Sequence, residues 1–208
     1  ASMLTRRSVD IGRPVVQTAE TPERLSESES KAQLAGFITL SGVGVLDAAV
    51  RTAALVFLPF VMDAKDMGAA QISVMLFLLF AGGAAGKFVC GWLGDRFSTV
   101  SIIWGTKGLT ALMLVLSLIT PPLAMAPLMV LTGIGLNGTS SVLYATVSDF
   151  VPATRRARFY GFYYTTNEIG TVVAPLVYGL VADIFSLNTT MIVMGIATAA
   201  ILPASLTL

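Results

Sequence analysis

The hydrophobic residues of this chain gather in six long runs, which are separated by short polar or proline-containing breaks. A bilayer core of about 30 Å is crossed by roughly 20 helical residues, and each run reaches that length. Backbone polar groups cannot stay unpaired in lipid, so each run is predicted to be a transmembrane helix. The predicted spans lie near 34–62, 70–93, 99–120, 123–147, 159–183 and 189–208.

A polar arm, residues 1–32, precedes the first span. It mixes arginines with acidic residues, and its run Ser26-Glu27-Ser28-Glu29-Ser30 offers nothing apolar to bury. Such a composition does not form a packed core. We therefore expect a largely disordered cytoplasmic linker. The chain does not begin with Met and ends in an apolar stretch, so we expect a fragment of a longer protein.

Composition supports an all-α membrane protein. Hydrophobic residues make up 55% of the chain and charged residues 12%, about half of the roughly 25% that is usual in soluble proteins. A net charge of +1 gives no electrostatic reason to expect nucleic acid as a partner. The sequence has no histidine, a single cysteine and no phosphate-binding loop. We therefore expect no enzyme activity, no metal site and no cofactor.

Lysine and arginine are distributed unevenly over the breaks. Five lie in the arm, one follows the second span and three follow the fourth, whereas the opposite side has only Lys65. Cytoplasmic loops carry the excess of basic residues in membrane proteins. Nine against one therefore predicts a multi-pass protein of the cell membrane (inner or plasma membrane) with both ends of the fragment in the cytoplasm.

The most specific motif closes the second span. Glycines 82, 86 and 91 leave one side of this helix nearly bare, which allows a neighbouring helix to approach closely. The helix then ends in Gly91-x-x-x-Asp95-Arg96, which resembles the signature loop of the major facilitator superfamily. The family pattern continues with a glycine and two basic residues, whereas this chain has Phe97-Ser98-Thr99-Val100.

The resemblance implies the C-terminal six-helix half of a secondary transporter, built as two inverted three-helix repeats. The third and sixth spans would lie outermost. The partners would be a small-molecule substrate, the lipid bilayer and the missing N-terminal six-helix half. The implied function is secondary active transport of a small organic solute or drug by alternating access, as uptake or efflux and coupled to protons. A passive six-helix channel or carrier and a non-transport membrane protein remain the alternatives.

The same resemblance implies a conformational latch at the cytoplasmic surface. The acid of the motif, Asp95, would lie near the start of the fifth span and hold one of two rocking states. A helix N-terminus and nearby arginines favour an anion there. The alternative is a solvated turn. The latch residues would be Gly91, Asp95, Arg96, Arg156 and Arg158.

Charged residues at membrane depth are candidates for substrate or proton coupling. Asp47 and Arg51 are four residues apart, so they share a helix face and can pair. Each costs about 2.5–3.5 kcal/mol at the bilayer centre, which favours a watery cavity or a partner charge over lipid. Glu168 has no basic residue within one turn of its helix. Because desolvation disfavours the charged form of an isolated carboxylate, Glu168 is the preferred proton carrier.

Two lysines and a polar stripe complete the candidate site. Lys107 is expected to extend toward the membrane surface, whereas Lys87 fits packing and cavity roles about equally. In the fourth span, polar residues recur at three- and four-residue spacing and predict one stripe. By family analogy this stripe lines the transport cavity, with interhelical hydrogen bonding as the alternative. Its members are Asn137, Ser140, Ser141 and Tyr144.

The predicted orientation can be tested with single cysteines in the loops. A cysteine at Ala64 is expected to react with an impermeant thiol reagent added outside cells, and one at Ala153 is not. Labelling would be measured in a background in which Cys90 is replaced by serine. The reverse pattern would contradict the orientation derived from the basic residues.

Overall fold

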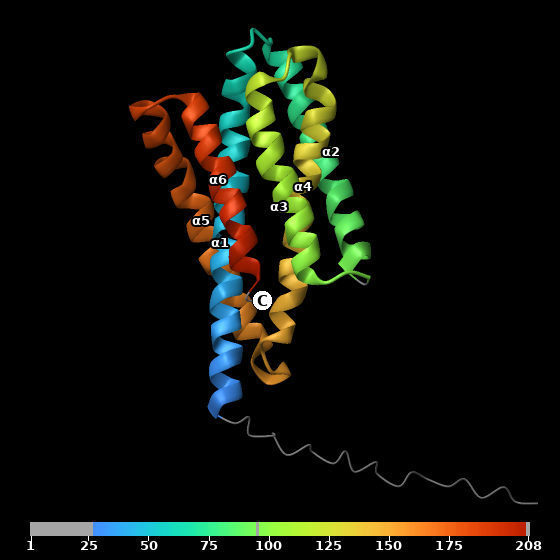
Figure 1. The fold of residues 1–208 in the computed structure, drawn as a ribbon, viewed down its shortest axis with the longest axis vertical. Helices are drawn as coiled ribbons and strands as arrows, with labels where there is room; N and C mark the ends of the chain where they lie inside the picture. The colour runs from blue at the N-terminus through green and yellow to red at the C-terminus, as the bar shows by residue number, and fades with distance from the viewer. Residues whose placement is uncertain (1–26, 95, 207–208) are drawn as a thin grey trace, which may run out of the picture.

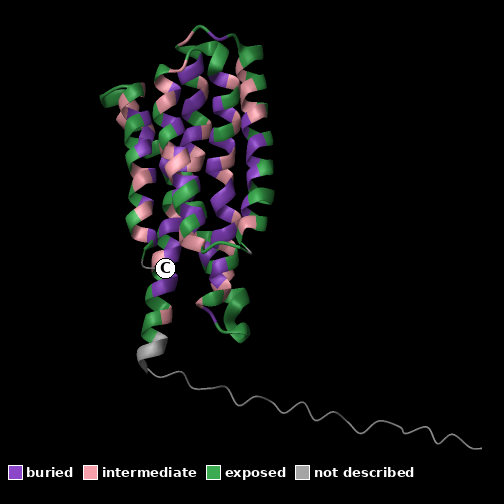
Figure 2. Cartoon of the chain, turned by 45° about the vertical axis from the view of Figure 1, so that its right-hand side comes forward, coloured by how far each residue is buried: buried purple, intermediate pink, exposed green. Residues whose placement is uncertain are grey.

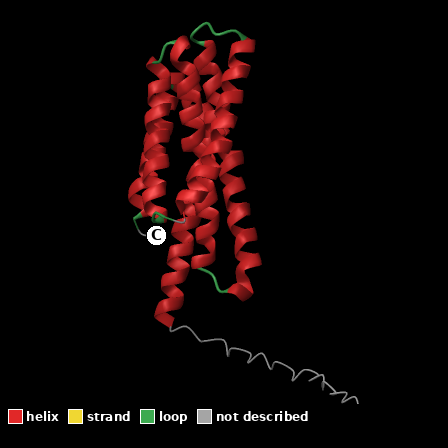
Figure 3. Ribbon diagram, turned by 90° about the vertical axis from the view of Figure 1, so that its right-hand side faces the viewer, coloured by secondary structure: helices red, strands yellow, loops and turns green. Residues whose placement is uncertain are grey.

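The computed structural model describes residues 27–94 and 96–206, which form six long helices joined by short loops (Figures 1 and 3). All six are long and apolar enough to cross a membrane. No strand occurs in the described ranges, so the prediction of an all-α membrane fold is confirmed. The helices are α1 (Glu27–Asp63), α2 (Ala69–Gly94), α3 (Thr99–Ile119), α4 (Met125–Thr146), α5 (Arg156–Ile184) and α6 (Leu187–Ser205).

The helix boundaries agree with the predicted spans to within a few residues, except at the start of α1. This helix begins at Glu27 and has 37 residues, so it takes in part of the arm that was expected to be disordered. Extending an existing helix costs far less than starting one, and glutamates are favourable in a first turn. At about 55 Å, α1 extends beyond the other helices (Figure 1). Residues 1–26 lie outside the described part.

Consecutive helices run in opposite directions, and their neighbours follow a two-fold pattern. Helix α4 packs against α2 and α3, α1 packs against α5 and α6, and α3 packs against α6. Exchanging α1–α3 with α4–α6 reproduces the same set of neighbours. Since α1 and α4 run in opposite directions, the two triplets are inverted repeats, as predicted.

Burial within the chain differs from the expectation for the third and sixth spans. The apolar windows of α1 and α4 are 50% and 56% buried, so these helices occupy the interior. Those of α3 and α6 are 44% and 33% buried, whereas those of α2 and α5 are only 22% buried. The outermost helices of this chain are therefore α2 and α5, because each packs along one main neighbour and leaves its other faces open (Figure 2).

The basic loops lie at one end of the bundle. The loop between α2 and α3, which contains Arg96, and the start of α5 lie at the end where α1 begins. The loop between α1 and α2, which contains Lys65, lies at the other end (Figure 1). There Lys65 Nζ donates a hydrogen bond to the carbonyl oxygen of Leu118, at 2.8 Å, near the C-terminal end of α3. This placement agrees with the two-sided distribution of charge derived from the sequence.

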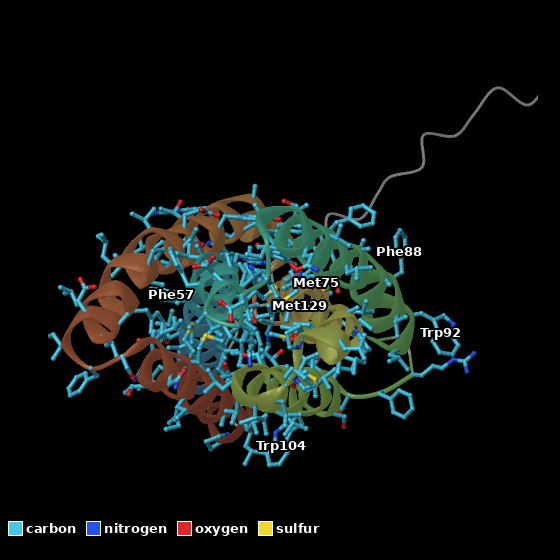
Figure 4. The ribbon with its side chains drawn as sticks, turned by 90° about the horizontal axis from the view of Figure 1, so that it is seen from above. Phe57, Met75, Phe88, Trp92, Trp104 and Met129 are labelled. Carbon is cyan, nitrogen blue, oxygen red and sulfur yellow. The ribbon has the colours of Figure 1, made fainter. Side chains whose placement is uncertain are left out.

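Large side chains divide between the interior and the outer surface. Seen from above, Phe57 and Met129 lie within the bundle, while Phe88, Trp92 and Trp104 point outward (Figure 4). Phe57 and Met129 belong to the larger of the apolar core clusters. The outward aromatic residues suit a helix surface that contacts lipid.

Glycines bring α2 and α4 into close contact. A Cβ atom added at Gly86 would lie 2.8 Å from the backbone of Ile134, and one at Gly82 would meet the backbone of Val130. Glycines 82 and 86 therefore have the predicted role of allowing a helix to approach closely. Gly91 does not, because nothing lies within 4 Å of its position.

The close contact at Gly86 and the open space at Gly91 predict different effects on stability for valine substitutions at the two positions. Gly86→Val forces a side chain into the backbone of α4, an overpacking that costs roughly 1–3 kcal/mol. Its apparent Tm in detergent should fall by about 5 °C. Gly91→Val should change the Tm by less than about 2 °C. Equal losses for both variants would show that close contact between α2 and α4 is not what these positions require.

Candidate functional site

An ion pair joins α1 to α3 inside the bundle. Lys107 donates a hydrogen bond to Oδ1 of Asp47, and the two residues are only 1% and 4% exposed. Two predictions are thereby wrong: the partner of Asp47 is Lys107 and not Arg51, and Lys107 does not extend toward the surface. The signal was in the helical spacing, because positions 103, 107, 110, 114 and 117 are all buried and form one inward face of α3.

The ion pair lies in a layer of polar side chains that separates two apolar core clusters. On α1, Phe37, Leu40 and Val43 belong to one cluster, and the other begins at Val50. Asp47 falls between them. We call this the central polar layer, and α3, α4, α5 and α6 contribute buried polar residues to it in the same way. Its members are Asp47, Thr106, Lys107, Thr110, Thr139, Ser140, Asn167 and Thr198.

Hydrogen bonds satisfy most hydroxyl groups of the layer within their own helices. Thr110 donates to the carbonyl of Thr106, and Thr198 donates to that of Met194. One hydroxyl pair crosses between helices: the Oγ1 atoms of Thr106 and Thr139 are 2.6 Å apart. This contact links α3 to α4 beside the ion pair.

A cluster of tyrosines continues the layer toward the end where α1 begins. The ring of Tyr144 on α4 stacks on Tyr164 with centroids 4.7 Å apart, and it meets the edge of Tyr163 at 5.4 Å. The hydroxyl of Tyr160 donates to the carbonyl oxygen of Tyr144 at 3.0 Å. These contacts fix α5 against α4 with an aromatic, partly polar surface.

Tyr163 and Asn167 bring this cluster up to α1. The Tyr163 hydroxyl and Asn167 Oδ1 lie so close to Gly44 that an added Cβ would be 2.6 and 2.7 Å from them. Asn167 Oδ1 is buried and has no hydrogen-bond partner in the described part of the chain. Sequence reasoning missed both residues, although their spacing of four placed them on one face of α5.

Arg51 lies one helical turn beyond Asp47 and is half-buried. Among the described residues it forms no ion pair, but both it and Asp47 interact electrostatically with the hydroxyls of Tyr144 and Tyr163. The site therefore combines a paired acid and base with a second base beside an aromatic cluster.

Glu168 and Lys87 lie on open faces of the bundle. Both side chains are exposed, and neither has a hydrogen bond or ion pair among the described residues. Glu168 adjoins Asn167 in sequence but lies on the outward side of α5, away from Asp47. The structure thus does not bring Glu168 to the Asp47–Lys107 pair.

The four polar residues of α4 contact different neighbours and do not form one continuous lining. Asn137 lies against Gly83 of α2, and Tyr144 stacks on Tyr164 of α5. The hydroxyls of Ser140 and Ser141 donate to carbonyls of α4 itself, at 2.8 and 2.9 Å. Of the four, Ser140 belongs to the central polar layer.

The candidate latch residues lie in separate places. Gly91 and Gly94 line a groove of about 310 Å³ with the end of α4 and Thr99. Arg96 stacks over the ring of Trp92, 4.2 Å from its centroid. Arg156 and Arg158 open α5, which packs against α1. Asp95 lies outside the described residues.

Six membrane-spanning helices in two inverted triplets, with an ion pair buried among them, define the class of this protein as a multi-pass membrane protein. Comparison with known proteins gives the family: the chain belongs to the Major Facilitator Superfamily, whose profile matches residues 40–208. The chain is also 31% identical over 150 residues to the gentisate transporter of Corynebacterium glutamicum. That match covers 71% of this chain and 33% of the relative's length.

These findings confirm the resemblance derived from the sequence and indicate solute transport across a membrane. They point to a transporter and not to an enzyme. The chain's match spans only about a third of the relative's length.

The assignment of the ion pair can be tested by removing each base separately. Lys107→Met leaves Asp47 buried without a partner and should cost about 3–5 kcal/mol of stability. Arg51→Met should cost less than about 1 kcal/mol, since Arg51 forms no ion pair with any residue that the structure describes. Unfolding in mixed micelles would measure both.

Replacing both partners provides the control. Asp47→Leu combined with Lys107→Met should recover most of the lost stability, because no unpaired charge is then buried. Equal losses for the Arg51 and Lys107 variants would contradict the assignment.

Proposed function

We propose that this chain carries out secondary active transport of a small organic anion, coupled to protons and working by alternating access. The observation that supports the proposal best is the buried Asp47–Lys107 pair, with Arg51 one turn away. Charges at this depth are costly, and in membrane proteins they mark substrate and ion pathways.

A carboxylate substrate fits the chemistry of these residues. Arg51 has no ion-pair partner among the described residues, and a guanidinium binds a carboxylate through two parallel hydrogen bonds. Tyr144 and Tyr164 offer aromatic surface nearby, which suits a flat ring. The similar protein from Corynebacterium glutamicum is named as a gentisate transporter. We therefore propose aromatic carboxylates as the substrate class.

Alternating access requires a second body against which this bundle moves. The open faces of α2 and α5 are where we place it, since these helices are only 22% buried in this chain. An N-terminal six-helix half in that position would cover Lys87 and Glu168. The latch remains a proposal: Asp95 would meet the start of α5 in one of two rocking states. Its residues would be Gly91, Asp95, Arg96, Arg156 and Arg158.

Proton coupling is assigned to Glu168, with Asp47 as the second candidate. Asp47 forms a buried ion pair with Lys107, and releasing it would leave Lys107 buried without a partner. Glu168 has no such cation among the described residues and can exchange its proton without breaking the central pair.

The proposal is tested by uptake of labelled gentisate into proteoliposomes under an imposed proton gradient. Wild-type protein should accumulate it, with saturation. Glu168→Gln should abolish accumulation but retain exchange of substrate across the membrane, because the site can still bind and reorient. The matched control is Asp183→Asn, an exposed acid near the far end of α5, which should behave as wild type.

The outcomes separate the competing functions. Saturable uptake that ignores the gradient would indicate a passive carrier, and unsaturable flux would indicate a channel. Accumulation by Glu168→Gln with unchanged pH dependence would exclude Glu168 as the coupling group and leave Asp47→Asn as the next variant. No uptake of any aromatic acid would overturn the substrate class. We also propose that the protein lies in the cell membrane with both termini of this chain in the cytoplasm.

A further inference from the structure

A groove of about 800 Å³ lies between the N-terminal part of α1 and the start of α5, apart from the central polar layer. Most of its lining is apolar, and two arginines border it. The lining residues are Leu34, Phe37, Ile38, Ser41, Arg155, Arg158, Phe159 and Phe162. We propose that this groove binds an anionic phospholipid, with the phosphate on the arginines and an acyl chain along the apolar wall.

Charge is the first argument for this occupant. Arg155 and Arg158 are exposed, and neither forms an ion pair among the described residues. No acidic residue lines the groove. Basic pockets between transmembrane helices near the membrane surface are a recurring way to hold anionic lipid headgroups.

The start of α5 adds to the attraction for a phosphate. This helix has no side-chain cap and no acidic residue in its first turn. Its first backbone N–H groups therefore lack side-chain partners, and the helix dipole favours an anion at this end. Both arginines lie within this same end of the helix.

The wall of the groove supplies the second argument. Ile38 and Phe162 expose 62% and 58% of their surface, and the edge-to-face contact of Phe37 with Phe159, at 4.9 Å, forms the floor. Within it Ser41 Oγ is more than nine-tenths buried and has no hydrogen-bond partner in the described part of the chain. An ester oxygen of a lipid would accept a hydrogen bond from the Ser41 hydroxyl. A small water-soluble anion would leave the apolar side chains of the groove exposed to water.

The test is lipid binding by the purified protein in detergent, followed by native mass spectrometry. Phosphatidylglycerol would be titrated against phosphatidylcholine with identical acyl chains. Wild-type protein should retain one molecule of phosphatidylglycerol in preference to phosphatidylcholine. Arg155→Ala combined with Arg158→Ala should weaken this binding roughly 25-fold, since each basic residue contributes about fivefold. The matched control is Arg156→Ala, an exposed neighbour that does not line the groove and should bind as wild type.

A second variant separates a lipid from a free phosphate. Ile38→Trp places a large side chain in the apolar part of the groove and leaves both arginines in place. It should therefore weaken the binding of phosphatidylglycerol without affecting the binding of inorganic phosphate. If glycerol phosphate displaced the lipid fully at equal concentration, the site would be a phosphate site and the proposal would be overturned. Equal retention by the double variant and Arg156→Ala would also overturn it, and would indicate that another part of the protein covers the groove.

Discussion

The buried contact between Asp47 and Lys107 constrains how α1 and α3 are placed against each other. Two charges removed from water must face one another, because either alone would be far more costly than the pair. Helix α3 packs chiefly against α4 and α6, and α1 packs chiefly against α5 and α6. The ion pair therefore ties together two helices that are not each other's main neighbours. It fixes how both are rotated.

The two repeats reach the same arrangement by different packing. Between α2 and α4 the contact is made by bare backbone, with Gly82 and Gly86 facing Gly133 and its neighbours. Between α1 and α5 the small residues Gly44 and Gly170 face larger partners, among them Tyr163 and Asn167. The first contact is mainly backbone against backbone, with Asn137 lying against Gly83. The second brings the larger polar side chains of Tyr163 and Asn167 against Gly44.

The spans themselves were predictable because the bilayer imposes length and apolarity on each helix separately. The family was predictable from Gly91-x-x-x-Asp95-Arg96 in its place among six spans. The partner of Asp47 was not. Spacing along one helix identifies Arg51 as a neighbour of Asp47. Lys107 is 60 residues away in sequence and contacts Asp47 only when α1 and α3 are packed in the orientation seen in the folded bundle.

A similar limit applies to glycines and to exposed charges. Gly82 and Gly86 lie on one face of α2 and meet the backbone of α4, whereas Gly91 lies about 140° further round the helix, where no described atom comes within 4 Å of an added Cβ. Glu168 and Asn167 are adjacent in sequence and about 100° apart around α5, yet one is exposed and the other is buried. Sequence alone places such residues on a helix but does not say what lies opposite.

The composition of the central polar layer bears on how the bundle can move. Most of its hydroxyls bond to carbonyls of their own helices, so sliding one helix past another leaves those bonds intact. Among the described residues of the layer, the polar contacts that cross between helices are the Asp47–Lys107 pair and the Thr106–Thr139 bond. Both involve α3. A rearrangement of α3 against α1 and α4 must therefore break or remake these two contacts, whereas α5 and α6 can shift without loss of a hydrogen bond in the layer.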